Sequence, residues 1–250
     1  MTTGRTLVVG GGIGGVTAAL CLARTGHEVV VLEQAQAFGE VGAGLQIGPN
    51  ASRVLHALGL EAPLRTLGFA PECAEMRHWR RGSVLYRTPF GDAVIDRFGA
   101  PYYHLHRADL LDVLLAAARA DDRVELRTGV TVEAAEDAGA EAVVLLRRGE
   151  ERADLVVGAD GIHSNVRASL FGPADARFTG NVAWRALVPA ERLPAGLVRP
   201  AATVWLGPGR HFVHYYVRRG ELVNCVCVVE KAGWEEESWS RRGDRSELVA

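Results

Sequence analysis

The N-terminal glycine cluster is the feature that most restricts how this chain can fold. A short apolar strand is predicted at Thr6–Gly10, and it leads into Gly10, Gly12 and Gly15, which stand in the G-x-G-x-x-G spacing. In that spacing the first glycine permits a sharp turn from strand to helix, and the second lets a pyrophosphate approach the main chain. The third lets the helix pack closely on the strand. The pattern therefore predicts a strand–turn–helix unit that binds a dinucleotide.

The residues that follow continue this unit. An apolar stripe at helical spacing predicts a helix over Ile13–Thr25, and a second strand is expected at Glu28–Leu32. The first turn of the helix, at Ile13 and Gly14, offers free N–H groups and a positive dipole end to phosphates. Glu33 ends the second strand, where a carboxylate accepts hydrogen bonds from a ribose diol and repels a 2′-phosphate. NAD or FAD is expected at this site rather than NADP, and a glycine-rich turn without a ligand is the alternative.

Charge and cysteine content exclude several classes of protein. The 250 residues carry 28 basic and 30 acidic side chains, so the net charge of -2 gives no general attraction to nucleic acid or to anionic membranes. The four cysteines form no C-x-x-C pair and have no histidines at ligand spacing, which indicates neither a metal site nor a disulfide framework. A reducing, cytoplasmic location is expected.

Three later segments carry further signals. Gly42–Leu60 combines a glycine-rich loop, which includes Gly44, with a helix that starts near Pro49, so a flat ring system can lie close to the main chain. Arg107 opens a helix that runs to about Arg119, and its guanidinium can reach a phosphate or a ring carbonyl. In Asp154–Arg167 a buried strand ends in a G-A-D-G turn, and a short helix follows.

With these motifs the chain resembles the class A flavoprotein monooxygenases, of the salicylate hydroxylase and 3-hydroxybenzoate 6-hydroxylase type. The family's first FAD fingerprint is matched by Gly10, Gly12, Gly15 and Glu33. Its DG motif is matched by Asp154, Gly158, Asp160 and Gly161.

The resemblance implies a role for each matched position. Glu33 would hold the adenosine ribose, Arg107 would bind FAD, and the main chain of Val130 would lie near the adenine. Asp160 and Gly161 would serve both FAD and NAD(P)H, and an ordinary acid in a turn at the end of a strand is the alternative for Asp160.

The resemblance also implies an α/β fold, with a Rossmann-like FAD-binding domain of the glutathione-reductase type and a β-sheet substrate domain. The later sequence is β-rich, with a hairpin at Cys73–Thr88 and strands at Asn181–Val188, Ala202–Leu206, His211–Arg218 and Glu221–Val229. We expect residues 1–70 and 101–176 to form the FAD-binding domain. Residues 71–100 and 177–250 are expected to form the substrate domain.

His211 and Tyr215 are the candidate catalytic residues. They are four positions apart on a predicted strand, so they project from the same face. Similar positions in the resembling hydroxylases point a histidine and a tyrosine at the aromatic substrate. A histidine can remove the proton of a ring hydroxyl, which makes the ring a better nucleophile. The alternative is that both are ordinary strand residues; His214 is expected on the opposite face, and His104 and His106 are expected to be structural.

The activity implied by the resemblance is hydroxylation of a small phenolic or hydroxypyridine-like aromatic acid by dioxygen. NADH or NADPH would be the electron donor, and a flavin C4a-hydroperoxide would carry the oxygen. The family continues with a strand ending in G-D-A-A-H, which this sequence lacks, so the segment that closes the flavin site is expected to be absent. The alternatives are a truncated, inactive remnant that binds FAD or another dinucleotide, a flavin epoxidase or halogenase on the same scaffold, and an NAD dehydrogenase.

Overall fold

The computed structural model describes residues 4–39, 42–174, 176–231, 233, 243–244 and 246. Contacts between residues divide the chain into two compact units. The first unit consists of Met1–Glu40 and Leu110–Arg177, and the second of Val41–Asp109 and Phe178–Ala250. Part of the predicted substrate domain, at 232, 234–242, 245 and 247–250, lies outside the described residues.

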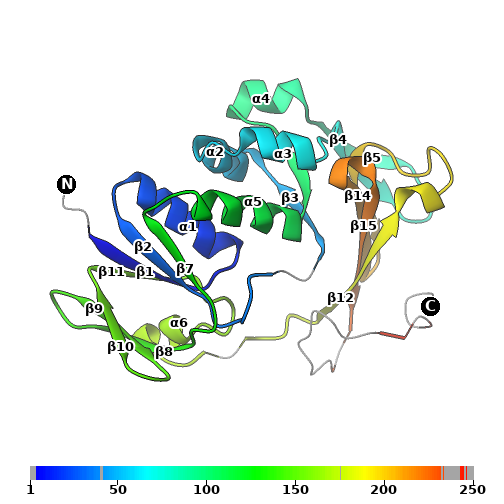
Figure 1. Ribbon diagram of the computed structural model, residues 1–250. Coiled ribbons are helices and arrows are strands. Elements are labelled where there is room, and N and C mark those ends of the chain that lie inside the picture. Colours follow the sequence, from blue (N-terminus) through cyan, green and yellow to red (C-terminus); the bar gives the residue numbers. More distant parts are fainter. Residues whose placement is uncertain are drawn as a thin grey trace. The chain divides into compact units, whose positions relative to one another are not determined.

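The first unit is built on a parallel sheet with the strand order β11-β1-β2-β7. Its strands are β1 (Arg5–Val9), β2 (Glu28–Leu32), β7 (Val124–Arg127) and β11 (Leu155–Gly158). Helix α1 (Ile13–Arg24) connects β1 to β2 and packs on the sheet through its buried apolar stripe (Figure 1). The predicted first strand, helix and second strand are confirmed, with end points within one residue.

A second, antiparallel sheet, which was not predicted from the sequence, completes this unit. Its strand order is β10-β9-β8, formed by β8 (Val132–Asp137), β9 (Ala142–Leu146) and β10 (Glu150–Ala153). Helix α6 (Asn165–Phe171) packs on β8. One buried cluster joins the two sheets, and it includes Leu7, Val9 and Leu32 from the parallel sheet and Val132, Val144 and Ala153 from the other.

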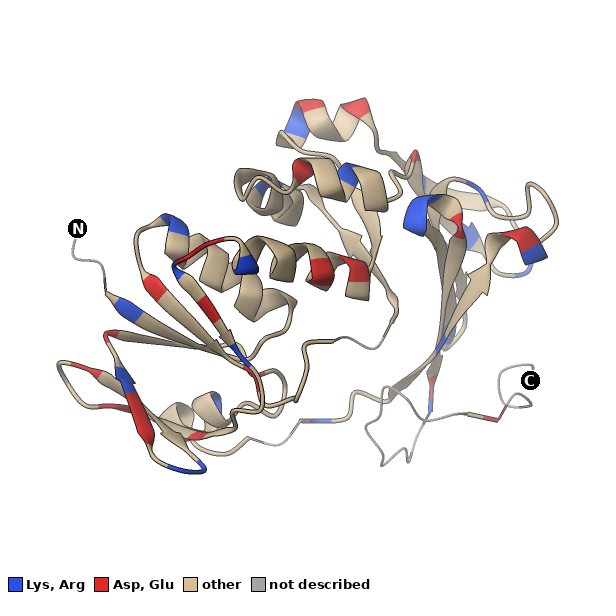
Figure 2. Cartoon of the chain, viewed as in Figure 1, with Lys and Arg blue, Asp and Glu red and all other residues tan. Residues whose placement is uncertain are grey.

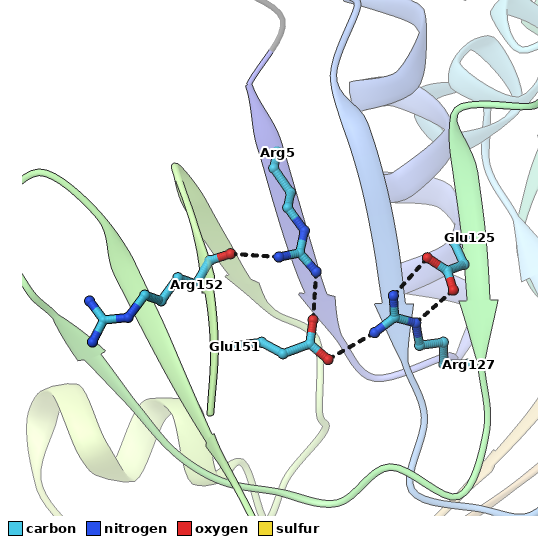
Figure 3. A network of polar contacts seen from close by, with 5 residues as sticks. All are labelled: Arg5, Glu125, Arg127, Glu151 and Arg152. Carbon is cyan, nitrogen blue, oxygen red and sulfur yellow. Dashed lines mark hydrogen bonds and ion pairs between the residues drawn. The ribbon is translucent and has the colours of Figure 1, made fainter. Parts of the chain in front are cut away.

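Charged side chains also tie the strands of the first unit together. Figure 2 shows basic and acidic positions interspersed on these strands. Glu151 in β10 bonds to Arg5 in β1 at 2.6 Å and to Arg127 in β7 at 2.8 Å (Figure 3). Arg127 also pairs with Glu125 on its own strand at 2.7 Å. Opposite charges thus connect strands that are distant in the sequence.

The second unit contains a six-stranded sheet with the order β12-β15-β14-β13-β4-β5. All neighbours are antiparallel except β13 and β4, which are parallel. The predicted hairpin and four strands are confirmed as β4 (Cys73–His78), β5 (Val84–Pro89), β12 (Asn181–Pro189), β13 (Ala201–Gly207), β14 (Arg210–Val217) and β15 (Leu222–Glu230).

The rest of the second unit includes a short two-stranded sheet, in which β3 (Gly44–Ile47) pairs with β6 (Tyr103–His106). Its helices are α2 (Pro49–Ala57), α3 (Glu61–Leu67) and α4 (Asp92–Phe98), with 3-10 turns at Ala190–Arg192 and Arg218–Gly220. Helix α5 (Arg107–Arg119) begins in this unit and continues in the first.

The two units differ from the predicted domains in where they place 41–70 and 101–109. Both segments were expected in the FAD-binding domain, yet they pack within the second unit. The main-chain N–H of Gly44 bonds to Asn224 in β15 at 2.8 Å. The Asp109 carboxylate binds the Arg218 guanidinium through two bonds of 2.7 and 2.9 Å. These contacts explain why the two segments group with the six-stranded sheet.

Three properties bear on the class of protein. None of the described helices is long and apolar enough to cross a bilayer. Cys21, Cys73, Cys225 and Cys227 are free thiols. Within the described ranges, no group of three or more His, Cys, Asp or Glu side chains is arranged to hold a metal ion.

Candidate functional site

The glycine turn of the first unit has the geometry that its spacing predicts. Gly10 has a φ of 108°, and a Cβ there would overlap the carbonyl oxygen of Ala159. A Cβ at Gly15 would overlap the carbonyl oxygen of Gly10. Both glycines are therefore required by close packing between the end of β1, the start of α1 and the residues after β11.

The N-terminus of α1 offers unpaired donors beside this turn. Gly12 is the N-cap and supplies no capping side chain, and no acidic residue lies in the first turn. The N–H of Val16 bonds to the Gly12 carbonyl at 3.0 Å, so the N–H groups that precede it in the first turn have no helical acceptor. Gly14 is exposed, and a Cβ on it would meet nothing within 4 Å. This open helix end fits the phosphates of a dinucleotide.

Glu33 lies directly after β2 and connects this strand to the glycine turn. Its Oε2 accepts the N–H of Gly11 at 2.7 Å, and its Oε1 accepts the N–H of Ala35 at 2.8 Å. An ionised carboxylate has about four acceptor positions, so two remain for a ribose diol. The predicted role of Glu33 therefore fits its surroundings, and the carboxylate has a second, structural task.

The structure adds a constraint to Val130. Its N–H donates to the main-chain carbonyl of Glu33 at 2.9 Å, which joins the loop after β7 to the end of β2. The preceding Gly129 has a φ of 72°, a value that favours glycine. The carbonyl of Val130, rather than its N–H, is therefore the main-chain group that it can offer to an adenine.

Asp160 caps the turn that follows β11. Its Oδ1 accepts the hydroxyl of Ser164 at 2.6 Å, and its Oδ2 accepts the N–H of Val166 at 3.1 Å. Ser164 in turn caps α6 by accepting the N–H of Arg167 at 2.9 Å. Gly161 has a φ of 82°, which few other residues adopt. The carboxylate thus has the turn-forming role of the structural alternative, with spare acceptor capacity for a ligand.

Two predicted site residues of the second unit lie in contact. A Cβ at Gly44 would lie 2.8 Å from Cε2 of Tyr215, so the main chain of β3 is in close contact with this ring. Tyr215 is 4% exposed, and burial raises its pKa to about 12, against a smaller opposing effect of the Arg185 charge. The phenol is therefore neutral and can act only as a hydrogen-bonding group near neutral pH.

Arg107 is the first residue of α5 and is attached to the same segment. Its main-chain N–H donates to the carbonyl of Ala43 at 2.9 Å. That bond fixes the start of α5 beside β3, on which Gly44 is the first residue.

His211 occupies a different environment from Tyr215. It is half-buried and lines a cavity of about 540 Å³ whose walls include Trp79, Trp184, Trp205, Arg210 and Phe212. Volumes of this order are typical of small-molecule sites. Trp184, Trp205 and Phe212 project from the face of the sheet opposite to Tyr215, as the strand register requires. The cavity therefore does not bring the two candidate catalytic residues together.

The other three histidines considered are buried. Nε2 of His214 lies 3.0 Å from Nε1 of Trp205, which donates to it, and burial and the charge of Arg77 lower the pKa of His214. Burial lowers the pKa of His106, which lies 3.5 Å from Asp109. His104 is fully buried, and burial lowers its pKa to about 3. Their surroundings fit the structural roles expected for His104 and His106.

Asn224 is a contact residue of this region that was not predicted from the sequence. It is fully buried, it accepts the Gly44 N–H, and it lies opposite Tyr215 in the ladder between β14 and β15. A single amide within the apolar run LVNCVCVV was the available signal, because a buried polar residue in such a strand needs a specific partner.

Comparisons with known proteins agree with this architecture. The 3-amino-4-hydroxybenzoate 2-monooxygenase PtnB3 of Streptomyces platensis is 40% identical over 98% of this chain and 61% of its own length. The 3-hydroxybenzoate 6-hydroxylase of Polaromonas naphthalenivorans (strain CJ2) is 39% identical over 97% of this chain and 60% of its own length. A variant of Klebsiella pneumoniae HpxO solved with FAD is 26% identical, with a TM-score of 0.79, over 94% of this chain and 59% of that one.

The chain thus spans about 60% of the length of the relatives it matches. A family model described as "FAD binding domain" matches residues 3–206, which include the glycine turn, Glu33, Arg107 and Asp160. This match decides between the two dinucleotides that the sequence left open, in favour of FAD. The chain belongs to the family of FAD-binding domains.

Proposed function

We propose that the protein is an FAD-dependent monooxygenase that consumes NADH or NADPH and dioxygen to hydroxylate a small phenolic or hydroxypyridine-like aromatic acid. The observation that carries the proposal is the likeness to two hydroxybenzoate monooxygenases over 97–98% of the chain. That likeness covers both the dinucleotide-binding turn and the six-stranded sheet with His211 and Tyr215.

The residues predicted to bind the cofactor would each hold a part of FAD. The N–H groups at Gly12, Ile13, Gly14 and Gly15 would bind its phosphates, and the free acceptor positions of Glu33 would bind its ribose. Val130, Asp160, Gly161, Arg107 and Gly44 complete the proposed cofactor set. When bound, FAD supplies the redox chemistry that passes electrons from NAD(P)H to dioxygen and one oxygen atom to the ring.

The residues of β14 would act on the substrate. His211 is proposed to take the proton of the ring hydroxyl at an imidazole nitrogen, which enriches the ring in electrons. Tyr215 does not line the cavity beside His211, so in this proposal it faces the substrate from the side of residues 42–48. It keeps its proton because burial raises its pKa to about 12, and it can therefore donate a hydrogen bond to a substrate oxygen. The surrounding sheet would keep water away from the reacting atoms.

The first test is an absorbance spectrum of the purified 250-residue chain after incubation with FAD. Retained flavin absorption, together with oxidation of NADH or NADPH that a hydroxybenzoate or hydroxynicotinate accelerates, supports the proposal. Failure to retain flavin favours the inactive remnant, and reduction of NAD by an alcohol favours a dehydrogenase.

Substitutions then test the roles on β14. His211→Ala should lower coupled hydroxylation much more than FAD content, and an unchanged hydroxylation rate removes His211 from the mechanism. Tyr215→Phe has a matched control in Tyr216→Phe. The Tyr216 hydroxyl projects from the opposite face and donates to the Val198 carbonyl at 3.1 Å. Only the Tyr215 variant should lose coupling.

The proposal includes a cytoplasmic location and no nucleic-acid or membrane partner. The four free thiols support a reducing compartment, and the net charge of -2 supports the absence of polyanionic partners.

A further inference from the structure

Asn224 occupies a position at which an apolar side chain would be expected. The strand that carries it reads LVNCVCVVE, and its side chain is fully buried. Its Nδ2 is buried without a hydrogen-bond partner, an arrangement that lowers stability relative to a well-packed valine or leucine. Packing alone therefore does not explain the presence of an amide.

The Oδ1 atom of Asn224 accounts for the amide. It accepts the main-chain N–H of Gly44 at 2.8 Å, across 180 residues of sequence. Gly44 begins β3, and the neighbouring residue Ala43 also receives the N–H of Arg107. The Asn224 side chain thus links β15 to the glycine-rich segment of residues 42–48.

The same link lies beside Tyr215. Asn224 and Tyr215 are directly opposed in the β14–β15 ladder. A Cβ at Gly44 would lie 2.7 Å from Cγ of Asn224 and 2.8 Å from Cε2 of Tyr215, so three groups meet where only glycine fits. The ring of His104 packs against Tyr215 with the centroids 4.4 Å apart.

Burial decides how Asn224 can act. Its free Nδ2 is closed off by protein atoms, so a ligand has no access to it. Any effect of Asn224 on chemistry must therefore pass through Gly44 and Tyr215, the two residues that it contacts or opposes.

We infer that Asn224 is a positioning residue, whose bond to Gly44 sets the spacing between the segment of residues 42–48 and the Tyr215 ring. In the proposed hydroxylase, on which this role rests, that spacing determines how closely the aromatic ring of the substrate is held. Asn224 would thereby act on substrate fit and on coupling without touching the substrate.

Three variants test the inference in the 250-residue chain. Asn224→Ala removes the acceptor of the Gly44 N–H. Asn224→Asp has nearly the same shape and keeps a carboxyl oxygen for that N–H. Val223→Ala is the matched control, because Val223 is the neighbouring residue on β15, is 1% exposed and projects from the opposite face. It reports what a buried truncation in this strand does to stability alone.

Two readouts separate positioning from stability. In hydrogen–deuterium exchange, the peptide covering residues 42–48 should exchange about tenfold faster in N224A than in V223A, the factor expected for one lost hydrogen bond. With FAD, NAD(P)H and a hydroxybenzoate, N224A should raise the KM for the aromatic acid and the share of hydrogen peroxide released per NAD(P)H, each about two- to tenfold. In N224D, the KM and the share of hydrogen peroxide should both return toward the values of the unsubstituted chain.

Each result decides the question. Equal exchange of the 42–48 peptide in N224A and V223A overturns the inference, as does an N224D variant that behaves like N224A. An unsubstituted chain that hydroxylates no aromatic acid overturns the proposed function instead. In that case the exchange measurement still tests whether the hydrogen bond to Asn224 protects Gly44, because exchange does not depend on catalytic turnover.

Discussion

The imidazole ring of His104 packs against the phenol ring of Tyr215, with centroids 4.4 Å apart and 44° between the planes. Burial acts on the two rings in opposite directions, lowering the pKa of His104 to about 3 and raising that of Tyr215 to about 12. The main chain of Tyr216 opposes the shift of His104 to a smaller extent. Both rings are therefore neutral near pH 7, and the pair is a core contact rather than a proton relay.

The neutral state of His104 makes stability depend on pH. The unfolded chain protonates this histidine near its ordinary pKa of 6.5, whereas the folded chain does so only near pH 3. The stability that depends on a neutral His104 is fully present above pH 6.5. As the pH falls toward 3, the free energy of unfolding decreases by up to about 1.4 kcal/mol per pH unit. His104→Phe keeps an aromatic ring and should flatten this decline in urea unfolding. His106 and His214 are present in both the unsubstituted chain and the His104→Phe variant, so they affect both equally. If stability declined with falling pH at the same rate in both proteins, His104 would not be the cause of the decline.

The glycine turn gives a second prediction, because neighbouring glycines do different things. Gly14 lies in the first turn of α1 with open space around its Cβ position. Gly14→Ala should raise the free energy of unfolding by up to about 1 kcal/mol, since alanine favours helix over glycine. Gly15→Ala should lower it by about 1–3 kcal/mol or more, because the new Cβ overlaps the Gly10 carbonyl. Thermal unfolding of the two variants measures both effects, and equal tolerance would show that α1 does not pack on the turn as described.

Glu33 combines a structural and a binding role, so its variants should separate the two. Glu33→Ala loses the acceptors of the Gly11 and Ala35 N–H groups and should lower stability by about 1–3 kcal/mol. Glu33→Gln keeps one amide oxygen as an acceptor and should be more stable than Glu33→Ala. Both variants lose a charged hydrogen bond to the cofactor, so their affinity for FAD should fall at least about tenfold below that of the unsubstituted chain. Fluorescence titration with FAD measures the affinity.

The control for Glu33 is Glu28→Ala, at the exposed opposite end of β2. It should leave FAD affinity unchanged. If the Glu33 variants also bind FAD as tightly as the unsubstituted chain, the ribose assignment is wrong.

These residues show how far the sequence alone reaches. Gly10, Gly15 and Glu33 were predictable because each is required by local geometry within one strand–turn–helix unit. The six-stranded sheet was predictable because its strands carry strong β-forming residues and turn signals at their ends. The sheet formed by β8, β9 and β10 was missed, since its short strands have a mixed pattern of exposed and buried residues.

The contacts around Tyr215 show where prediction stopped. Asn224 and Gly44 are 180 residues apart, and the single hydrogen bond between them leaves no periodicity in either segment. The ion pair between Asp109 and Arg218 likewise leaves no pattern in the sequence, although it helps to group residues 101–109 with the six-stranded sheet. Side-chain pairs that join distant segments depend on the assembled fold, and a sequence pattern cannot specify them in advance.

The network in Figure 3 supplies the last prediction, because its two glutamates differ in what they connect. Glu151 joins Arg5 and Arg127 from two other strands, and its side chain is 20% exposed. Glu125 pairs with Arg127 on its own strand and is 56% exposed. Glu151→Gln should therefore lower the free energy of unfolding by about 1 kcal/mol at low salt, and Glu125→Gln by less than about 0.5 kcal/mol. The difference should shrink as sodium chloride is added, because salt screens charges near the surface. If the two variants lost equal stability, or if salt left their difference unchanged, packing rather than charge would hold β1, β7 and β10 together.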